Sequence, residues 1–149
     1  MKTMKSSLFI VIESADGGGK STQAKLLVAR LQAFGPVLHT AEPTSTTPPG
    51  ARIRRILAGN EDYVTPLETA RLFAEDRLLH LADAILPALA CGQTVVCERY
   101  LLSSIAYQTA IGVKLADVLR LNRYAPKPDL TVVLDVPLEV RRQRLLELG

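Results

Sequence analysis

SADGGGKST, at residues 14–22, constrains the fold of this 149-residue chain more than any other segment. It follows LFIVIE (8–13), a continuous apolar run rich in β-branched residues, as expected of a strand buried on both faces. Residues 21–34 then carry apolar side chains at helical spacing. In this context glycines let backbone N–H groups close around phosphate oxygens, and the helix adds unpaired donors and the positive end of its dipole. The segment predicts a phosphate-binding loop, with an ordinary strand-to-helix turn as the alternative.

Three positions of this loop have particular predicted roles. Lys20 can reach the outer phosphates as a point charge, and the hydroxyl of Ser21 can ligate Mg²⁺. The usual pattern is G-x-x-x-x-G-K-[ST], and Ser14 stands at its first glycine position. If that position requires a positive φ, the serine costs about 1 kcal/mol.

Beyond the loop, strands and helices alternate along the chain. The expected strands are 8–13, 37–40, 94–97 and 129–136, and the expected helices are 21–34, 52–59, 66–90, two between the last two strands, and 138–148. Residues 41–50 are predicted to form a proline-rich loop, and Pro87 should break or kink the long helical stretch. This alternation predicts an α/β fold with a parallel sheet covered by helices on both faces. With neither repeat nor linker, residues 1–149 are expected to form a single domain.

The composition limits the classes of partner. The chain is 48% hydrophobic and 22% charged, with a net charge of +3 and an isoelectric point near 9.0. This mild positive charge suits a small polyanionic ligand but lacks the clustered basic stripe typical of nucleic-acid binding. No segment has the pattern of a membrane span or a signal peptide, so a cytoplasmic protein without a membrane partner is expected. Cys91 and Cys97 lack metal-ligand spacing and are expected to be small hydrophobes around a buried strand.

Five segments resemble the thymidylate kinase family in its bacterial form. They are FIVIESADGGGKSTQ (9–23), TAEPT (40–44), LFAEDRLLH (72–80), CERYLLSSIAYQ (97–108) and PDLTVVLDVPLEV (128–140), in the family's order along the whole chain. The resemblance implies the three-layer α/β/α fold of nucleoside monophosphate kinases, ATP as donor, dTMP as acceptor, Mg²⁺ and a homodimer. The residues alone predict only a nucleoside-phosphate kinase. The implied ATP-binding residues are Asp16, Gly17, Gly18, Gly19, Lys20, Ser21 and Thr22.

One helix is expected to recognise the acceptor base. Phe73 and Arg77 are four residues apart and share a helix face. A pyrimidine could stack on the ring of Phe73 while Arg77 hydrogen-bonds a base carbonyl, as residues at these positions do in the resembled family. The alternative places Phe73 in the core and pairs Arg77 with Glu75 or Asp76 at the surface.

Further acceptor contacts are implied by the resemblance. Ser104 lies where a polar side chain contacts the base, and Gln108 follows on the same helix. Tyr107 lies where a ring presses on the sugar, although a core tyrosine is the alternative. Asp16 is implied to contact the sugar 3′-hydroxyl, and Glu42 at the end of the second strand faces the same cleft.

Glu98 and Arg99 follow the third strand at its carboxyl end, where open α/β sheets bind ligands. The resemblance implies that Arg99 grips the acceptor phosphate and that Glu98 lies close to the metal. Family members usually have aspartate in place of Glu98, and often an arginine in place of Ala41. Glu98 and Arg99 form the predicted catalytic set together with Lys20. Ser21 and Glu98 form the predicted metal set. A strand-end ion pair is the structural alternative for Glu98 and Arg99.

The transferring phosphoryl group normally needs a further arginine. The loop has Gly17-Gly18 where some relatives carry that arginine, so the sequence resembles the class that supplies it from a mobile lid. The lid, final strand and final helix are expected to be absent from these 149 residues, which should bind nucleotides but turn over poorly. Arg141, Arg142 and Arg144 are expected to be hinge or helix-surface charges. Two alternatives remain: a kinase for another nucleotide or nucleoside, and a diverged nucleotide-binding module.

Overall fold

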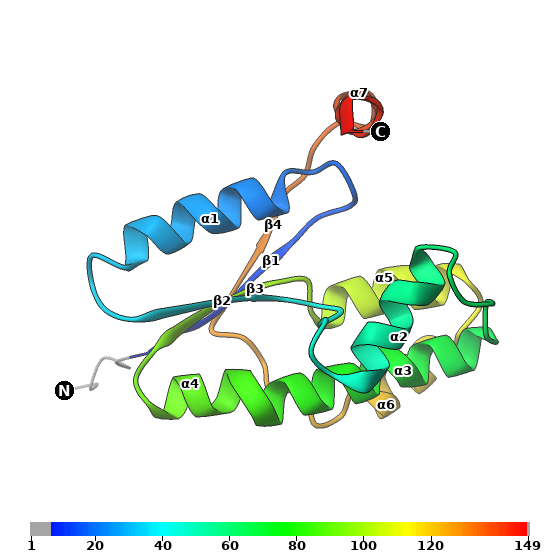
Figure 1. The fold of residues 1–149 in the computed structure, drawn as a ribbon, viewed down its shortest axis with the longest axis horizontal. Helices are drawn as coiled ribbons and strands as arrows, with labels where there is room; N and C mark the ends of the chain where they lie inside the picture. The colour runs from blue at the N-terminus through cyan, green and yellow to red at the C-terminus, as the bar shows by residue number, and fades with distance from the viewer. Residues whose placement is uncertain (1–6, 149) are drawn as a thin grey trace.

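A four-stranded parallel sheet forms the centre of the computed structural model, which describes residues 7–148 (Figure 1). Its strands are β1 (Phe9–Glu13), β2 (Val37–Ala41), β3 (Thr94–Glu98) and β4 (Leu130–Val133), in the order β2-β3-β1-β4. Every neighbouring pair is parallel. The predicted parallel sheet is confirmed, and its last strand is shorter than the expected 129–136.

Helices cover both faces of this sheet. Figure 1 shows α1 on one side of the strands and the continuous rod of α3, η1 and α4 on the other. The helical elements are α1 (Lys20–Leu31), α2 (Pro48–Leu57), α3 (Pro66–His80), the π-helical turn η1 (Leu81–Ile85), α4 (Leu86–Ala90), α5 (Leu101–Ala110), α6 (Leu115–Leu121) and α7 (Leu138–Leu148). None of the helices between residues 7 and 148 has the length and apolarity needed to cross a bilayer.

The alternation of side chains in β1 divides the core in two. Phe9 and Val11 pack with Leu81 and Ile85 under the η1 side of the sheet. Ile10 and Ile12 point the other way and pack with Ala24 of α1. Because successive side chains of a strand point to opposite faces, a strand covered on both sides must be apolar throughout. This explains why LFIVIE is uninterrupted by polar residues until Glu13.

The predicted loop at 41–50 is wrong in its second half, because α2 begins at Pro48 and not at residue 52. Thr47 is the N-cap and accepts a hydrogen bond from the backbone N–H of Gly50. The two prolines stand in the first helical turn, where the missing N–H groups would have no helical partner in any case. They therefore start the helix. The Glu42–Pro43 peptide bond is cis.

The break expected near Pro87 occurs one turn earlier, as a π-helical turn. The N–H of Leu86 donates to the carbonyl of Leu81, five residues back. Pro87 has no N–H to donate, and a wider turn before it accommodates the missing bond. The expectation for the cysteines is half right: Cys97 is buried in β3, whereas Cys91 is exposed.

Candidate active site

The loop between β1 and α1 has the backbone of an anion site. Gly17 and Gly19 adopt φ values of +75° and +84°, and Gly19 is the N-cap of α1 without any side-chain cap. A side chain on Gly17 would also lie 2.7 Å from the carbonyl oxygen of Arg141. Since no side chain caps the helix, its first N–H groups remain available to phosphate oxygens.

Ser14 causes no strain at the position usually held by glycine. Among residues 7–148, the only non-glycine residue with a positive φ is Arg99. The Ser14 hydroxyl instead folds over the loop and donates to the carbonyl of Ala15 at 2.8 Å. A Cβ on Gly18 would lie 1.6 Å from that hydroxyl, so Ser14 and Gly18 fit one another.

Lys20 is bonded to its own loop. Its Nζ donates to the carbonyl oxygens of Ser14 at 3.1 Å and Ala15 at 3.3 Å. Burial lowers the pKa of Lys20, and the nearby charge of Arg99 lowers it further. Both effects disfavour the ammonium, whereas an arriving polyphosphate would favour it.

Arg144 is exposed on the surface of α7, as the sequence predicts. It also reaches the phosphate loop, because its Nη1 donates to the carbonyl oxygen of Gly17 at 3.3 Å. Arginine is therefore present at the phosphate loop, supplied by α7.

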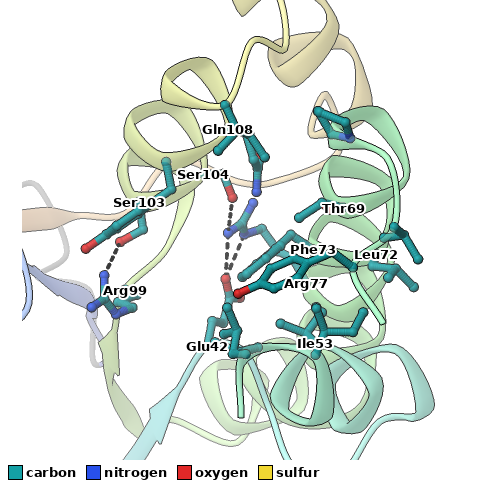
Figure 2. A pocket seen from close by; sticks show the side chains of 18 of the residues that line it. Glu42, Ile53, Thr69, Leu72, Phe73, Arg77, Arg99, Ser103, Ser104 and Gln108 are labelled. Carbon is teal, nitrogen blue, oxygen red and sulfur yellow. Dashed lines mark hydrogen bonds and ion pairs between the residues drawn. The ribbon is translucent and has the colours of Figure 1, made fainter. Parts of the chain in front are cut away.

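A cavity of about 480 Å³ opens between α2, α3 and α5, within the size range of small-molecule sites. Figure 2 shows Phe73 and Arg77 from one helix facing Ser104 and Gln108 from another. All eight predicted acceptor-site residues line it: Asp16, Glu42, Phe73, Arg77, Arg99, Ser104, Tyr107 and Gln108. The structure thus brings together residues up to about ninety positions apart in the chain, with the loop glycines outside the cavity.

Arg77 is held inside a buried network and not at the surface. Its Nε donates to Glu42 at 2.9 Å, its Nη2 donates to Ser104 at 2.9 Å, and its Nη1 donates to Asn122. The suggested alternative partner Asp76 bonds to Thr44 and Thr47 instead. Arg77 is therefore fixed in place before any ligand arrives.

This network leaves complementary polar groups for a ligand. A guanidinium has five N–H donors, and the bonds to Glu42, Ser104 and Asn122 leave one N–H on Nη1. In the described part of the chain, Gln108 Oε1 is the buried side-chain N or O atom without a partner. An unsatisfied buried acceptor costs about 1–3 kcal/mol, which a ligand N–H would recover. One donor, one acceptor and the ring of Phe73 suit a pyrimidine carrying a carbonyl beside an N–H.

Arg99 connects the cavity to the loop. Its φ of +66° costs a non-glycine residue about 1–2 kcal/mol. Two bonds stabilise this turn: the N–H of Arg99 donates to Ile12 at 2.9 Å, and the N–H of Tyr100 donates to Glu13 at 2.8 Å. The guanidinium of Arg99 bonds to Asp16 in the phosphate loop. A group held by Arg99 would therefore lie between the cavity and the loop.

Glu98 is not paired with Arg99, so the strand-end ion pair is wrong. Its carboxylate accepts from the Ser21 hydroxyl at 2.6 Å and contacts His39 Nε2 at 2.8 Å. A hydroxyl and a carboxylate side by side at the start of α1 are oxygen ligands of the kind that Mg²⁺ prefers. These two residues fit a magnesium ion bound with nucleotide phosphates.

A second group of metal-ligand types is less suited to a cation. Glu42, His80 and Cys97 lie within 4.8 Å of one another and are buried. The carboxylate of Glu42 already accepts from Arg77 and contacts His80 Nδ1 at 3.1 Å. Burial, and next the charge of Glu42, raises the pKa of the Cys97 thiol well above its usual value. The group is better described as an ion-pair network that includes a neutral thiol.

Three residues that support the site were missed by sequence analysis: Glu13, His39 and Asn122. Glu13 offered a signal, since a carboxylate at the end of an apolar strand is rarely buried without a task. Asn122 lies in LNRYAP, which carries no local pattern, and only the fold brings it to Arg77.

A phosphate loop joined by Arg99 to a base-sized cavity defines a nucleoside monophosphate kinase of the phosphate-loop class. The family model described as "Thymidylate kinase" matches residues 12–148. The chain belongs to the thymidylate kinase family.

Individual relatives agree with this assignment. The probable thymidylate kinase of Pyrococcus abyssi is 43% identical over 143 residues, which cover 91% of this chain and 69% of that protein. The thymidylate kinase of Desulfotalea psychrophila is 41% identical over 137 residues, covering 91% of this chain and 67% of that one. The crystal structure of thymidylate kinase from Ehrlichia chaffeensis superposes with a TM-score of 0.78 at 29% identity, covering 95% of this chain and 86% of that one.

Proposed function

We propose that this protein transfers the γ-phosphoryl group of ATP to a phosphate oxygen of dTMP, giving dTDP and ADP. The bond from the γ-phosphorus to the bridging oxygen of ADP breaks as the bond to dTMP forms. The observation that supports this most is the cavity lined by Phe73, by Arg77 with its one remaining N–H, and by Gln108 with its unpaired oxygen. Thymine offers the matching ring, carbonyl and N–H.

The remaining residues have roles in positioning and charge neutralisation. A phosphate oxygen is already an acceptor at neutral pH, so no strong base is needed. Lys20 and the loop amides would hold the donor phosphates, and Arg99 would hold the acceptor phosphate. Ser21 and Glu98 would hold Mg²⁺, which when bound supplies charge neutralisation between the donor phosphates. Asp16, bonded to Arg99 at the cavity, would contact a sugar hydroxyl of dTMP.

An acceptor panel tests the proposal. Initial rates with ATP and dTMP, dUMP, CMP, AMP or thymidine should rank dTMP first, with ADP and dTDP as products. Preference for any other acceptor would overturn the roles given to Phe73 and Arg77. The low turnover expected of these 149 residues stays a prediction, and the same assay measures it.

Calorimetric titration separates a kinase from a nucleotide-binding module. A kinase should bind both ATP and dTMP, whereas a module that has lost catalysis and only senses ATP should ignore dTMP. We also propose a homodimer, as the family resemblance implies, and a cytoplasmic protein without nucleic-acid or membrane partners, as the composition indicates. Light scattering on the purified protein should give twice the chain mass of 16.2 kDa.

A further inference from the structure

Glu98 contacts two elements that both lie far from it in the chain, α1 and β2. Its Oε2 accepts from the Ser21 hydroxyl of α1 at 2.6 Å, and its Oε1 lies 2.8 Å from His39 Nε2 on β2. The carboxylate is nearly buried, with the Glu98 side chain 12% exposed. Because a carboxylate only accepts, the imidazole Nε2 must carry the hydrogen of this bond.

The sheet register explains how the two side chains meet. His39 is the Cα partner of Val96 in the β2–β3 pair, and Glu98 lies two residues beyond Val96. Residues two apart on a strand share a face, so His39 and Glu98 are diagonal neighbours on the side covered by α1. Diagonal neighbours are about 7–8 Å apart at Cα, which only long side chains span. The second methylene of glutamate gives Glu98 the reach to contact His39 while its other oxygen faces Ser21.

We propose that His39 is a positioning residue for the magnesium-nucleotide site. By holding Oε1, it directs Oε2 towards the Ser21 hydroxyl and stops the longer side chain from rotating away from the loop. The role rests on the proposed function in one respect, namely that Ser21 and Glu98 hold Mg²⁺ with ATP. The competing explanation is that His39 only ties β2 to β3, in which case its loss would alter stability alone.

Two substitutions at His39 distinguish these explanations. His39→Ala removes the donor, whereas His39→Gln places an amide N–H near the position of Nε2. The measured quantity is the Mg²⁺ concentration that gives half-maximal binding of a fluorescent ATP analogue, so no turnover is needed. His39→Ala should raise this half-maximal Mg²⁺ concentration about tenfold, the usual effect of removing a residue that orients a metal ligand. His39→Gln should bring the concentration most of the way back to the wild-type value. The Kd for dTMP, measured by calorimetry, should change less than twofold.

Val37→Ala is the matched control. Val37 lies two residues earlier on the same face of β2 and packs against the α1 side of the core. Its truncation should lower the free energy of unfolding without moving the Mg²⁺ midpoint. If His39→Ala behaves in the same way, or if alanine and glutamine have equal effects, the inference is wrong.

A double-mutant cycle tests the contact itself. Glu98→Asp shortens the side chain by one methylene and should lose His39, so adding His39→Ala should shift the Mg²⁺ midpoint no further. Independent, multiplicative effects of the two changes would overturn the inference. Wild-type ATP binding that ignores Mg²⁺ would overturn it as well. Normal Mg²⁺-dependent binding without dTMP turnover would count against the proposed function alone.

Discussion

Two arginine–carboxylate pairs lie at the two ends of the site, and they differ in how far they are exposed to solvent. At the base end, Arg77 and Glu42 are 2% and 3% exposed. At the phosphate end, Arg99 and Asp16 are 19% and 64% exposed. Removing one partner of a buried pair strands a charge in a low dielectric, whereas an exposed pair exchanges its partner for water. The base end is built before the ligand arrives, and the phosphate end can rearrange around it.

The other contacts of the phosphate end follow the same pattern. Lys20 bonds to loop carbonyls and Ser21 bonds to Glu98, so the groups that would hold phosphates and metal are paired with one another. Each of these bonds can be replaced by one to a nucleotide. At the base end, by contrast, Arg77 and Gln108 leave one N–H and one buried acceptor for the ligand.

The largest expected effect breaks the buried pair. Glu42→Gln should lower the free energy of unfolding by about 3–5 kcal/mol, because Arg77 would remain buried without a counter-charge. The matched change at the other end, Asp16→Asn, should cost about 0–1 kcal/mol. Urea denaturation of both variants measures the difference. Equal losses would contradict the contrast between the two ends.

The next effect acts on turnover and should leave stability nearly unchanged. Lys20→Ala removes the charge aimed at the donor phosphates and should lower kcat by about 10²–10³-fold, the usual cost of removing one stabilising group from a transferring centre. Affinity for dTMP should be retained, because none of the base-cavity contacts involves Lys20. Arg99→Ala serves as the comparison and should chiefly weaken the acceptor. If both variants behave like wild type, the assignment of the phosphate end is wrong.

A smaller effect, opposite in sign for binding and stability, is expected at Gln108. Gln108→Leu removes a buried oxygen that has no partner in the free protein, so the free energy of unfolding should stay the same or rise. Loss of the bond to the ligand should weaken dTMP binding by about 0.5–1.5 kcal/mol, or up to roughly tenfold. Ser104→Ala is the control, because it removes an acceptor of Arg77 and should also lower stability. A Gln108→Leu variant that loses stability would show that the oxygen is satisfied.

The part of the site that the sequence predicted depends on local spacing. The loop is contiguous, and Phe73 and Arg77 share a face because four residues separate them on one helix. The supporting bonds join residues 35 apart for Glu42 and Arg77, 45 apart for Asn122 and Arg77, and 87 apart for Glu13 and Tyr100. Contacts between residues so far apart in the chain depend on strand order and register, which a single sequence does not determine. The same holds for Arg144, whose place at the loop follows from where α7 packs.

The smallest effect concerns the pH dependence of stability at the phosphate end. Burial, followed by the charge of Arg99, lowers the pKa of Lys20 in the folded state, while the unfolded chain keeps a value near 10.5. Between the lowered pKa and 10.5, the unfolded state binds more protons at Lys20 than the folded state does. The contribution of Lys20 to the free energy of unfolding therefore rises with pH in this window. Wild type should therefore gain stability relative to Lys20→Met as pH increases through this window. Saturating ATP should offset the lowering of the Lys20 pKa, because phosphate charge beside the ammonium raises that pKa again. Urea denaturation from pH 8 to 10.5, with and without ATP, measures both slopes; a wild-type slope that ATP leaves unchanged would mean that Lys20 does not face the nucleotide.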